Sequence, residues 1–583
     1  MKCYRILFVL TCCFEFFSAD AQRGGFLKAE GQRIVDGQGN NLVLRGIGLG
    51  GWMLQEGYML RLYHEGQQYR IRQRIDSFLT KEQTAKFYEL WRTNHTSKSD
   101  IDSLHAWGFN SVRLPMHYEL YTLPSDQEKN KQNDTWLPTG FALTDSLVSW
   151  CRQNNMYVFL DLHAAPGGQG NDLNISDRDP SKPSLWQSEA DKQKTIRLWR
   201  KLAERYVSDT TVGGYDILNE PNWGFEDSIK DRNGLNEQKN IPLRKLLQDI
   251  TNAIREVDKN HIIIIEGNGW GNNYHGMLPT WDPNMVLSFH KYWNKNDIQS
   301  IQYILDYRSK YNVPVWVGET GENSNTWFTE AIRLFESNNI GWSWWPLKKM
   351  GLNNPLQIPS NTDYDSLVNY WHGNSSRPTN ETAYRGLMEL VKNTKCENNI
   401  MHRNVVDAMI RQPFNKTTIP FGQNRITPGK IIKAVNYDLG VNGSAYFDVD
   451  TANTGDGNEG NRGHYYRNDG VDIFEDSLQK GEYYVGQIEN GEWLQYTIDV
   501  QIPGTYKLIF QVASPKSEGA VFITVDGNRV AGSPVISIPA TGGYHDWRVV
   551  AIENISLTAG THRLRVHAAH GGFNLKSIGF AKP

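Results

Sequence analysis

The stretch HIIIIEG, residues 261–267, is a short, uninterrupted apolar run that stops at a glutamate and a glycine. A strand that faces water on one side alternates apolar and polar residues, whereas a strand buried on both faces is apolar throughout. This stretch therefore predicts a strand at the centre of a parallel sheet.

Seven further runs of this kind occur between residues 42 and 347, and stretches with helical periodicity, such as 188–207 and 242–257, separate them. In chain order the eight runs are LVLRGIGL (42–49), NSVRLP (110–115), MYVFLDLH (156–163), GGYDILNE (213–220), HIIIIEG (261–267), MVLSFHKY (285–292), VPVWVGE (313–319) and IGWSWWPL (340–347). Eight buried strands that alternate with helices predict an α/β fold, the (β/α)8 TIM barrel.

The sequence changes in character after residue 412. Residues 413–429 are rich in Pro, Asn and Thr, which predicts a linker. From 430 to 583, short alternating runs such as GTYKLIFQVA (504–513) are separated by Gly and Asn turns, which predicts an all-β sandwich of the jelly-roll kind. We therefore expect a barrel domain over residues 22–412 and a sandwich over 430–583.

Residues 1–21 have a basic start, an apolar stretch and an A-x-A site at 19–21, which predicts a secretory signal cleaved before Gln22. No later run of about 18 apolar residues follows, so we expect no membrane span. We expect the protein to be secreted, or to lie in the periplasm or at the cell surface.

The charge and cysteine content narrow the class of partner. A net charge of -3, from 61 basic and 64 acidic residues, argues against nucleic acid as a ligand. Only Cys151 and Cys396 follow the predicted signal, too few for a metal cluster or a disulfide scaffold. The 19 Trp and 27 Tyr residues favour surfaces that stack on sugar rings. We expect a monomer that acts on a polysaccharide without a metal or other cofactor.

Two carboxylates stand at the ends of predicted strands. Glu220 ends the fourth run and Glu319 ends the seventh. Because the active site of such a barrel lies at the carboxyl ends of its strands, both side chains should face one pocket. Two carboxylates across a pocket are the minimum equipment for cleaving a glycosidic bond. Glu220 and Glu319 are therefore the predicted catalytic pair.

Other polar and aromatic residues lie at the same strand ends and are predicted to bind substrate: Arg113, His163, His290, Tyr292 and Trp345. Arg113 should hold Glu319 ionised, and Tyr292 should donate a hydrogen bond to it. Trp345 offers a flat face to a pyranose ring.

Two further carboxylates compete for a catalytic role. Asp161 lies two residues before His163 and is expected to point into the barrel wall or a neighbouring loop. Glu266 ends the fifth run and is the strongest rival to Glu220; we expect it to lie behind the catalytic residues.

Five short motifs occur in a characteristic order: VRLP (112–115), DLH (161–163), LNEP (218–221), HKY (290–292) and GE (318–319). Together they resemble glycoside hydrolase family 5, over roughly residues 26 to 395. The resemblance implies a retaining mechanism, with Glu220 as acid/base and Glu319 as nucleophile. It also implies that Asn219 binds the 2-hydroxyl of the sugar beside the cleaved bond.

The stretch RGIGLGGWMLQEGY (45–58) resembles the exo-β-1,3-glucanase branch of that family, which implies that Glu56 contacts the terminal glucose. The segments 121–141, 164–188 and 348–376 are long for βα loops, and long walls favour a pocket closed at one end. The predicted function is a retaining, exo-acting β-glucanase. The alternatives are an endo-β-1,4-glucanase or mannanase and, from another class, a non-catalytic polysaccharide-binding protein.

The segments YYVGQIENGEWLQYTI, TGGYHDWRVV and GGFNLKSIGF, between 483 and 580, resemble carbohydrate-binding module family 6. The resemblance implies that Tyr544 stacks on a sugar and that Asn574 binds it. The family's second aromatic falls at Gln487, where Tyr483 or Tyr484 could substitute.

The family's calcium ligands fall at Lys433, Val435 and Lys576, none of which donates a carboxylate, so we expect no calcium site. Because the first and last strands pair in this family, we expect Lys433 and Lys576 to lie near each other across the sandwich.

Overall fold

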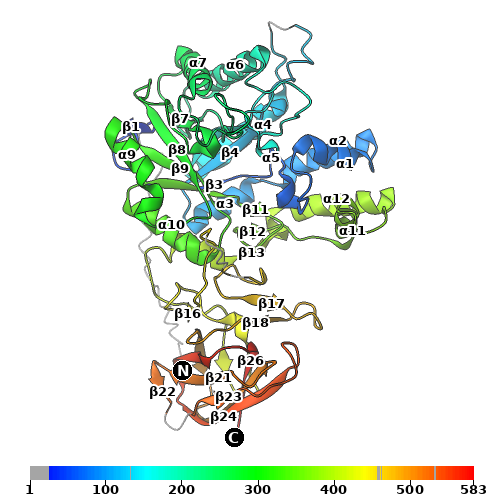
Figure 1. Ribbon diagram of the computed structural model, residues 1–583, viewed down its shortest axis with the longest axis vertical. Coiled ribbons are helices and arrows are strands. Elements are labelled where there is room, and N and C mark those ends of the chain that lie inside the picture. Colours follow the sequence, from blue (N-terminus) through cyan, green and yellow to red (C-terminus); the bar gives the residue numbers. More distant parts are fainter. Residues whose placement is uncertain (1–24, 131–132, 456–459, 461, 531–533) are drawn as a thin grey trace, which may run out of the picture.

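The structure is a computed structural model that describes residues 25–583, except 131–132, 456–459, 461 and 531–533. The predicted signal segment lies outside the described residues. Figure 1 shows the barrel with its helices in the upper part and the C-terminal sandwich below it.

Eight parallel strands close into a barrel in the order β10-β3-β4-β5-β6-β7-β8-β9, which confirms the predicted fold. Their bounds are β3 Arg45–Gly48, β4 Ser111–His117, β5 Tyr157–Ala164, β6 Val212–Asp216, β7 Ile262–Glu266, β8 Met285–Lys291, β9 Val315–Gly321 and β10 Gly341–Trp345. One boundary differs from expectation: the fourth run leaves the sheet at Asp216, so Ile217 to Glu220 form an irregular extension beyond β6.

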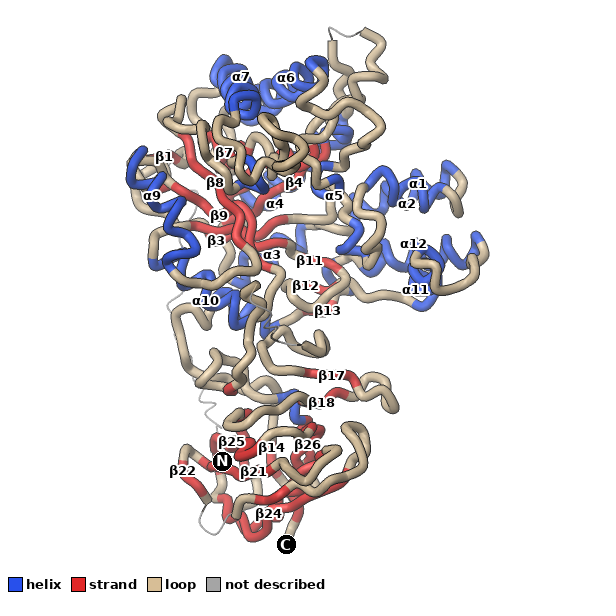
Figure 2. Tube along the Cα trace, viewed as in Figure 1, coloured by secondary structure: helices blue, strands red, loops and turns tan. Residues whose placement is uncertain are grey.

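Helices surround the barrel, as the tube in Figure 2 shows. Their bounds are α3 Lys98–Trp107, α4 Pro138–Gln153, α6 Glu189–Tyr206, α7 Ile241–Val257, α9 Gln302–Tyr311, α10 Asn325–Ser337 and α13 Arg403–Ile410, with single turns at α5 Leu173–Ser176 and α8 Asn268–Gly271. Four more helices, α1 Gln68–Asp76, α2 Lys81–Asn94, α11 Thr362–Trp371 and α12 Asn380–Asn393, pack on one another as a lobe beside the barrel.

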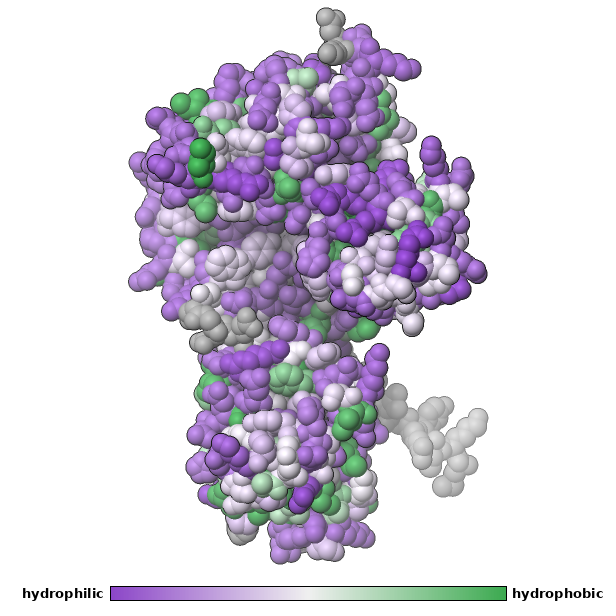
Figure 3. Space-filling view, turned by 45° about the vertical axis from the view of Figure 1, so that its right-hand side comes forward, coloured by the Kyte–Doolittle hydropathy of each residue, from purple (hydrophilic) through white to green (hydrophobic). Residues whose placement is uncertain are grey.

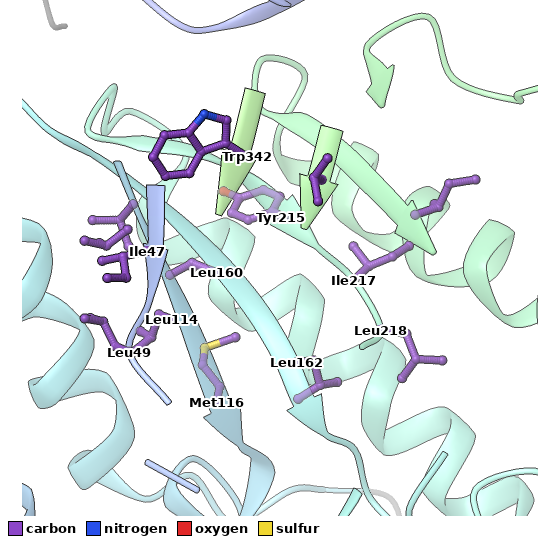
Figure 4. Packing of buried hydrophobic residues seen from close by; sticks show 14 of the residues in the cluster. Ile47, Leu49, Leu114, Met116, Leu160, Leu162, Tyr215, Ile217, Leu218 and Trp342 are labelled. Atoms are coloured by element: carbon purple, nitrogen blue, oxygen red, sulfur yellow. The ribbon is translucent and has the colours of Figure 1, made fainter. Parts of the chain in front are cut away.

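Alternation along each strand sorts its side chains between two environments. On β5, Leu160 and Leu162 point outward and pack in the layer between strands and helices, as Figure 4 shows. Phe159 packs in the barrel interior, where the hairpin of β1 (Lys28–Glu30) and β2 (Arg33–Val35) covers the amino-terminal end. Because successive residues face opposite sides, Asp161 and His163 also face the interior, one layer nearer the carboxyl ends.

The sandwich consists of two sheets around one apolar core. One sheet contains β14 Arg425–Ile426, β16 Tyr446–Phe447, β19 Trp493–Val500, β21 Ala520–Val525, β22 Asn528–Arg529, β23 Ile536–Ser537 and β25 Gly560–His570. The other contains β15 Ile431–Lys433, β17 Ile473–Glu475, β18 Tyr483–Val485, β20 Gly504–Ala513, β24 Arg548–Leu557 and β26 Asn574–Ala581. Within the predicted linker, β14 pairs with β19. A small sheet of β11 Lys348–Lys349, β12 Leu356–Gln357 and β13 Ile400–Met401 lies between the barrel and the sandwich (Figure 1).

Candidate active site

Glu319 reaches the barrel interior because β9 contains a bulge. Val315 and Val317 point outward into the helix-facing core, so strict alternation would also turn residue 319 outward. The register with β8 shifts here, since Phe289 pairs with Val317 but His290 pairs with Glu319. Gly318 is the extra residue, and a Cβ at this position would lie 2.2 Å from Ser288 Oγ. The bulge thus re-aims the glutamate toward the pocket.

Arg113, on β4, is fully buried at the centre of this layer and contacts four carboxylates. Its guanidinium lies 2.5 Å from Glu319 Oε1 and 2.9 Å from Asp216 Oδ2. It lies 3.0 Å from Glu266 Oε1 and 3.2 Å from Asp161 Oδ2. A buried guanidinium with partners on every side fixes these carboxylates in position.

Glu319 is the ionised member of the predicted pair. Tyr292 donates a hydrogen bond of 2.9 Å to its Oε2, and Arg113 contacts its Oε1. Burial alone would raise the pKa of Glu319, but the charges of His290, Arg113 and His163 outweigh it and lower the pKa. Arg113 and Tyr292 therefore lie where the sequence predicts them, beside Glu319.

Glu220 faces the same pocket from the extension beyond β6. Its backbone adopts φ +41°, a strained conformation for a non-glycine residue, and its N–H donates to Glu266 Oε2 at 2.7 Å. Burial raises the pKa of Glu220 to about 6; His290 opposes the shift, while Glu319 and Glu266 add to it. One carboxyl oxygen of Glu220 lies within 4.8 Å of one carboxyl oxygen of Glu319. The pKa values of two facing carboxyl groups are thus shifted in opposite directions.

His290 lies between the carboxylates. Its Nδ1 is 2.6 Å from Glu220 Oε1, and its Nε2 is 3.2 Å from Glu266 Oε1. The carboxylates raise the pKa of His290 well above its usual value, although burial opposes this. Glu220, His290 and Glu319 are close enough to surround a cation. However, both ring nitrogens of His290 already face carboxylate oxygens, so neither is free for a metal.

The remaining predicted substrate-binding residues lie beside Arg113 and the catalytic pair. Asn219 accepts a hydrogen bond of 2.8 Å from Arg113 and lies 3.4 Å from His163 Nε2. The rings of His163 and Trp345 stack at 5.1 Å between centroids. Glu56 is 6% exposed, and its Oε1 is buried without a hydrogen-bond partner. Burial, with the nearby negative charges of Glu319 and Glu322, raises the pKa of Glu56 well above its usual value.

The prediction for Asp161 was wrong. Its side chain lies inside the barrel, where Oδ2 is 2.7 Å from His163 Nδ1 and 3.2 Å from Arg113. The sequence analysis also missed Asp216, which contacts Arg113 from β6. Alternation places both aspartates on the interior face, in the same layer as Arg113, and would have identified them.

In the sandwich, Tyr544 is 49% exposed, whereas Asn574 is buried and donates 2.8 Å from Nδ2 to the carbonyl of Tyr544. Tyr484 is 5% exposed and stacks on Phe474, so it presents no open face beside Tyr544. Tyr483 packs against Tyr465 and Tyr466, on the side that faces the barrel.

At the positions implied for calcium ligands, the structure has ion pairs between side chains. Lys576 Nζ lies 2.7 Å from Asp476 Oδ2, and Lys433 Nζ lies 3.0 Å from Glu482 Oε1. Lys433 pairs in register with Ser577, so the two lysines are close along the sheet, but each is neutralised by its own carboxylate. Two ammonium groups do not fit a calcium site.

A buried carboxyl of raised pKa that faces one of lowered pKa inside a (β/α)8 barrel is the arrangement that glycoside hydrolysis requires. Residues 74–351 match the family described as Cellulase (glycosyl hydrolase family 5), and residues 463–582 match Carbohydrate binding module (family 6). The chain thus carries a family 5 glycoside hydrolase domain followed by a family 6 carbohydrate-binding domain, which confirms both resemblances.

Several known proteins are similar to this chain. "Beta-xylosidase" of Phanerodontia chrysosporium is 24% identical over 416 residues, 63% of this chain and 82% of that protein. "Glucan 1,3-beta-glucosidase" of Blumeria graminis is 32% identical over 193 residues, 32% of this chain and only 42% of its own length. The crystal structure of rutinosidase from Aspergillus niger is 18% identical, covers 53% of this chain and 90% of its own, and has a TM-score of 0.42. In the part of the chain that the structure describes, no helix has the length and apolar character needed to cross a membrane.

Proposed function

We propose that this chain is a retaining β-glucanase in which Glu319 is the nucleophile and Glu220 the acid/base. The observation that carries the proposal is the facing pair itself, with oxygens within 4.8 Å and pKa values shifted in opposite directions. Direct attack needs carboxyl groups about 5–5.5 Å apart, whereas attack through a water needs about 6.5–9.5 Å. The observed separation supports direct attack.

The reaction then has two steps. Glu319 attacks the anomeric carbon as Glu220 gives its proton to the departing glycosidic oxygen, which leaves a covalent glycosyl ester on Glu319. Glu220, now ionised, takes a proton from a water that attacks the same carbon and releases Glu319. Arg113 and Tyr292 hold the nucleophile ionised, and His290 lies against both carboxyl groups.

For the substrate, we propose exo attack on β-1,3-glucan, with Glu56, His163, Asn219 and Trp345 around the terminal glucose. Glu56 offers an unpartnered buried oxygen to a sugar hydroxyl, and Trp345 offers an aromatic surface. The relatives named glucan 1,3-beta-glucosidase support this linkage. The relatives named endoglucanase C keep the endo-acting alternative open, at 24% identity over 42% of this chain.

A product analysis tests the proposal. The purified protein is incubated with β-1,3-, β-1,6- and β-1,4-glucan, mannan and an aryl β-xyloside, and early products are identified by size and anomeric form. We expect glucose alone, as the β-anomer, from β-1,3-glucan. Oligosaccharides from β-1,4-glucan would favour the endo alternative. If the aryl xyloside were the best substrate, xylan fragments would replace β-glucan as the proposed substrate. An α-anomer as first product would contradict the retaining mechanism.

The proposal includes export of the chain. The basic and apolar start and the A-x-A site at 19–21 support it. Expression in a secreting host should yield a protein whose amino terminus is Gln22.

A further inference from the structure

A cavity of about 1090 Å³ lies between the barrel and the sandwich. The barrel contributes residues from the loops that follow β3, β9 and β10, among them Tyr58, Glu322 and Lys349. The sandwich contributes Tyr465 and Tyr483. Figure 1 shows β17 and β18 at this junction, and Figure 3 shows the wider barrel above the narrower sandwich. The volume is large enough for more than one sugar ring.

The two walls of this cavity are fixed to each other by buried hydrogen bonds. The loop that follows Glu319 begins α10, where the Asn325 N–H donates to the Asn468 carbonyl at 2.7 Å. Asn325 Nδ2 donates to Asp469 Oδ1 at 2.7 Å, and Asn468 Nδ2 donates to the Asn323 carbonyl at 2.8 Å. All four side chains are buried or nearly so. Buried, satisfied polar networks hold two surfaces in one arrangement.

Three side chains of the cavity lining contact one another on the side toward Trp345, and we call Tyr58, Glu322 and Lys349 the partition. Lys349 forms an ion pair with Glu322, and its Nζ lies 5.2 Å from the centre of the Tyr58 ring. Tyr58 hydrogen-bonds to Glu322, and its hydroxyl accepts 3.0 Å from Trp345 Nε1. Among the described residues, the cavity lining includes the partition but neither Trp345 nor Glu56. Tyr58 therefore lines the cavity and also contacts Trp345 of the catalytic site.

The backbone of the partition is strained at Glu322. Glu322 adopts φ +52°, a left-handed conformation that a non-glycine residue takes only when its surroundings impose it. The contacts of Glu322 with Lys349 and Tyr58 supply that constraint.

The position of the partition identifies the end of the substrate that it faces. Glu220 follows β6, which lies directly opposite β10 in the eight-stranded ring. The partition follows β3, β9 and β10, on the side of Glu319 and Trp345. Because the acid protonates the departing part of the substrate, that part lies on the side of Glu220. The partition must then face the glycone, the part that carries the anomeric carbon.

The far wall of the cavity is suited to sugar rings. Tyr465 is 42% exposed and lines the cavity from the sandwich. Tyr465 is held between His464 at φ +54° and Tyr466 at φ +64°. Two strained residues that flank an exposed aromatic indicate that its direction matters. Tyrosine provides a flat apolar face together with a hydroxyl for hydrogen bonding.

We propose that the interdomain cavity is a glycone-side extension of the catalytic site, and that the partition closes it and thereby limits the product to a single sugar. This inference rests on the proposed exo-acting function and names the residues that set it. The sandwich supplies the outer wall of the extension through Tyr465. Removal of the partition should let a glucan chain run past Trp345 into the cavity, so that the enzyme releases longer products.

The test compares products released from a soluble β-1,3-glucan at early times. The wild type should release glucose. Tyr58→Ala, which removes the central ring of the partition, should raise the ratio of di- and trisaccharide to glucose about tenfold or more. Lys349→Ala opens the same partition from β11 and should act in the same direction. Tyr63→Ala is the matched control, since it removes a tyrosine of the same loop that lines the cavity but is not part of the partition.

The double variant Tyr58→Ala/Tyr465→Ala tests the role of the sandwich and should lose most of the gain in longer products. Each variant is first checked for an unchanged melting temperature and for turnover of an aryl β-glucoside. If both partition variants fold and turn over the aryl glucoside yet release only glucose from the polymer, the inference is wrong while the proposed function stands. If the wild type itself releases oligosaccharides first, both the exo assignment and the partition's role fail.

Discussion

In the barrel, Arg113 and His290 are buried among five carboxylates, Asp161, Asp216, Glu220, Glu266 and Glu319, so negative groups outnumber the positive ones. In the sandwich, Lys576 and Lys433 each face one carboxylate. Burial, with the negative charges of Glu319 and Glu266, raises the pKa of Glu220 to about 6, although His290 opposes the shift. The Lys576–Asp476 pair of the sandwich is balanced instead, since one carboxylate faces one ammonium. Buried charge therefore serves chemistry around Arg113 and stability at Lys576.

The largest expected effect follows from removing the predicted nucleophile of the barrel, Glu319. Glu319→Ala should lower kcat by about 10⁴- to 10⁶-fold, as expected when a covalent nucleophile is lost. Azide should restore part of the turnover of an activated aryl glucoside, because it can attack the anomeric carbon in place of the carboxylate. The glycosyl azide formed should have the configuration opposite to the substrate. An unchanged fold without any rescue would count against the role of Glu319.

Removing Lys576 tests the claim that the sandwich uses paired charge for stability. Lys576→Met leaves Asp476, 1% exposed at its side chain, without a cation, and should cost about 3–5 kcal/mol of unfolding free energy. Lys433→Met is the matched control: its pair with Glu482 is 43% and 40% exposed, so its loss should cost about 0–1 kcal/mol. Denaturant unfolding of the full chain measures both.

The Lys576–Asp476 pair predicts that calcium does not change the stability of the protein. The melting temperature of the wild type should not change between calcium and a chelator, because the ammonium of Lys576 already neutralises Asp476. The contribution of this pair should weaken in acid: the hydrogen bond from Lys576 lowers the pKa of Asp476 although burial opposes it, so stability is lost as the pH falls through that lowered value. A clear rise in melting temperature with calcium would contradict the ion-pair interpretation.

The pH profile of kcat/KM sharpens the comparison on the barrel side. Glu220 must hold its proton, so activity should fall about tenfold per pH unit above its pKa of about 6. Glu319 must be ionised, so the acid limb should lie below the ordinary range of a glutamate. Glu220→Gln should abolish the alkaline limb with a substrate whose leaving group needs no acid. An alkaline limb that survives this change would assign the proton to another group.

A small effect is expected at the exposed aromatic of the sandwich. Tyr544→Ala removes a stacking surface that contributes about 0.5–1.5 kcal/mol and should weaken retention on insoluble β-1,3-glucan by about tenfold at most. Turnover of a soluble aryl glucoside should not change. Full retention of the variant would place the binding surface elsewhere on the sandwich.

The strands and the catalytic pair were predictable because they depend on local signals. Continuous apolar runs identified all eight barrel strands, and Glu220 and Glu319 stood at their carboxyl ends. The position of Asp161 was mistaken because it was treated as a single residue rather than by its phase along β5. The partition could not be predicted, since Tyr58, Glu322 and Lys349 meet through the packing of three loops. Likewise, only the tertiary structure places Tyr483 at the cavity and not beside Tyr544.

The hydrogen bonds between the loop after Glu319 and the sandwich have a consequence for protein engineering. Binding domains are commonly exchanged between enzymes on the assumption that a flexible linker leaves them independent of the catalytic domain. Here the loop that carries Asn325 would lose buried partners if the sandwich were removed or replaced. Unsatisfied polar groups would then remain four to six residues from the nucleophile. We expect the catalytic domain to need its own sandwich. The two domains should therefore be transferred together when either is used in another protein.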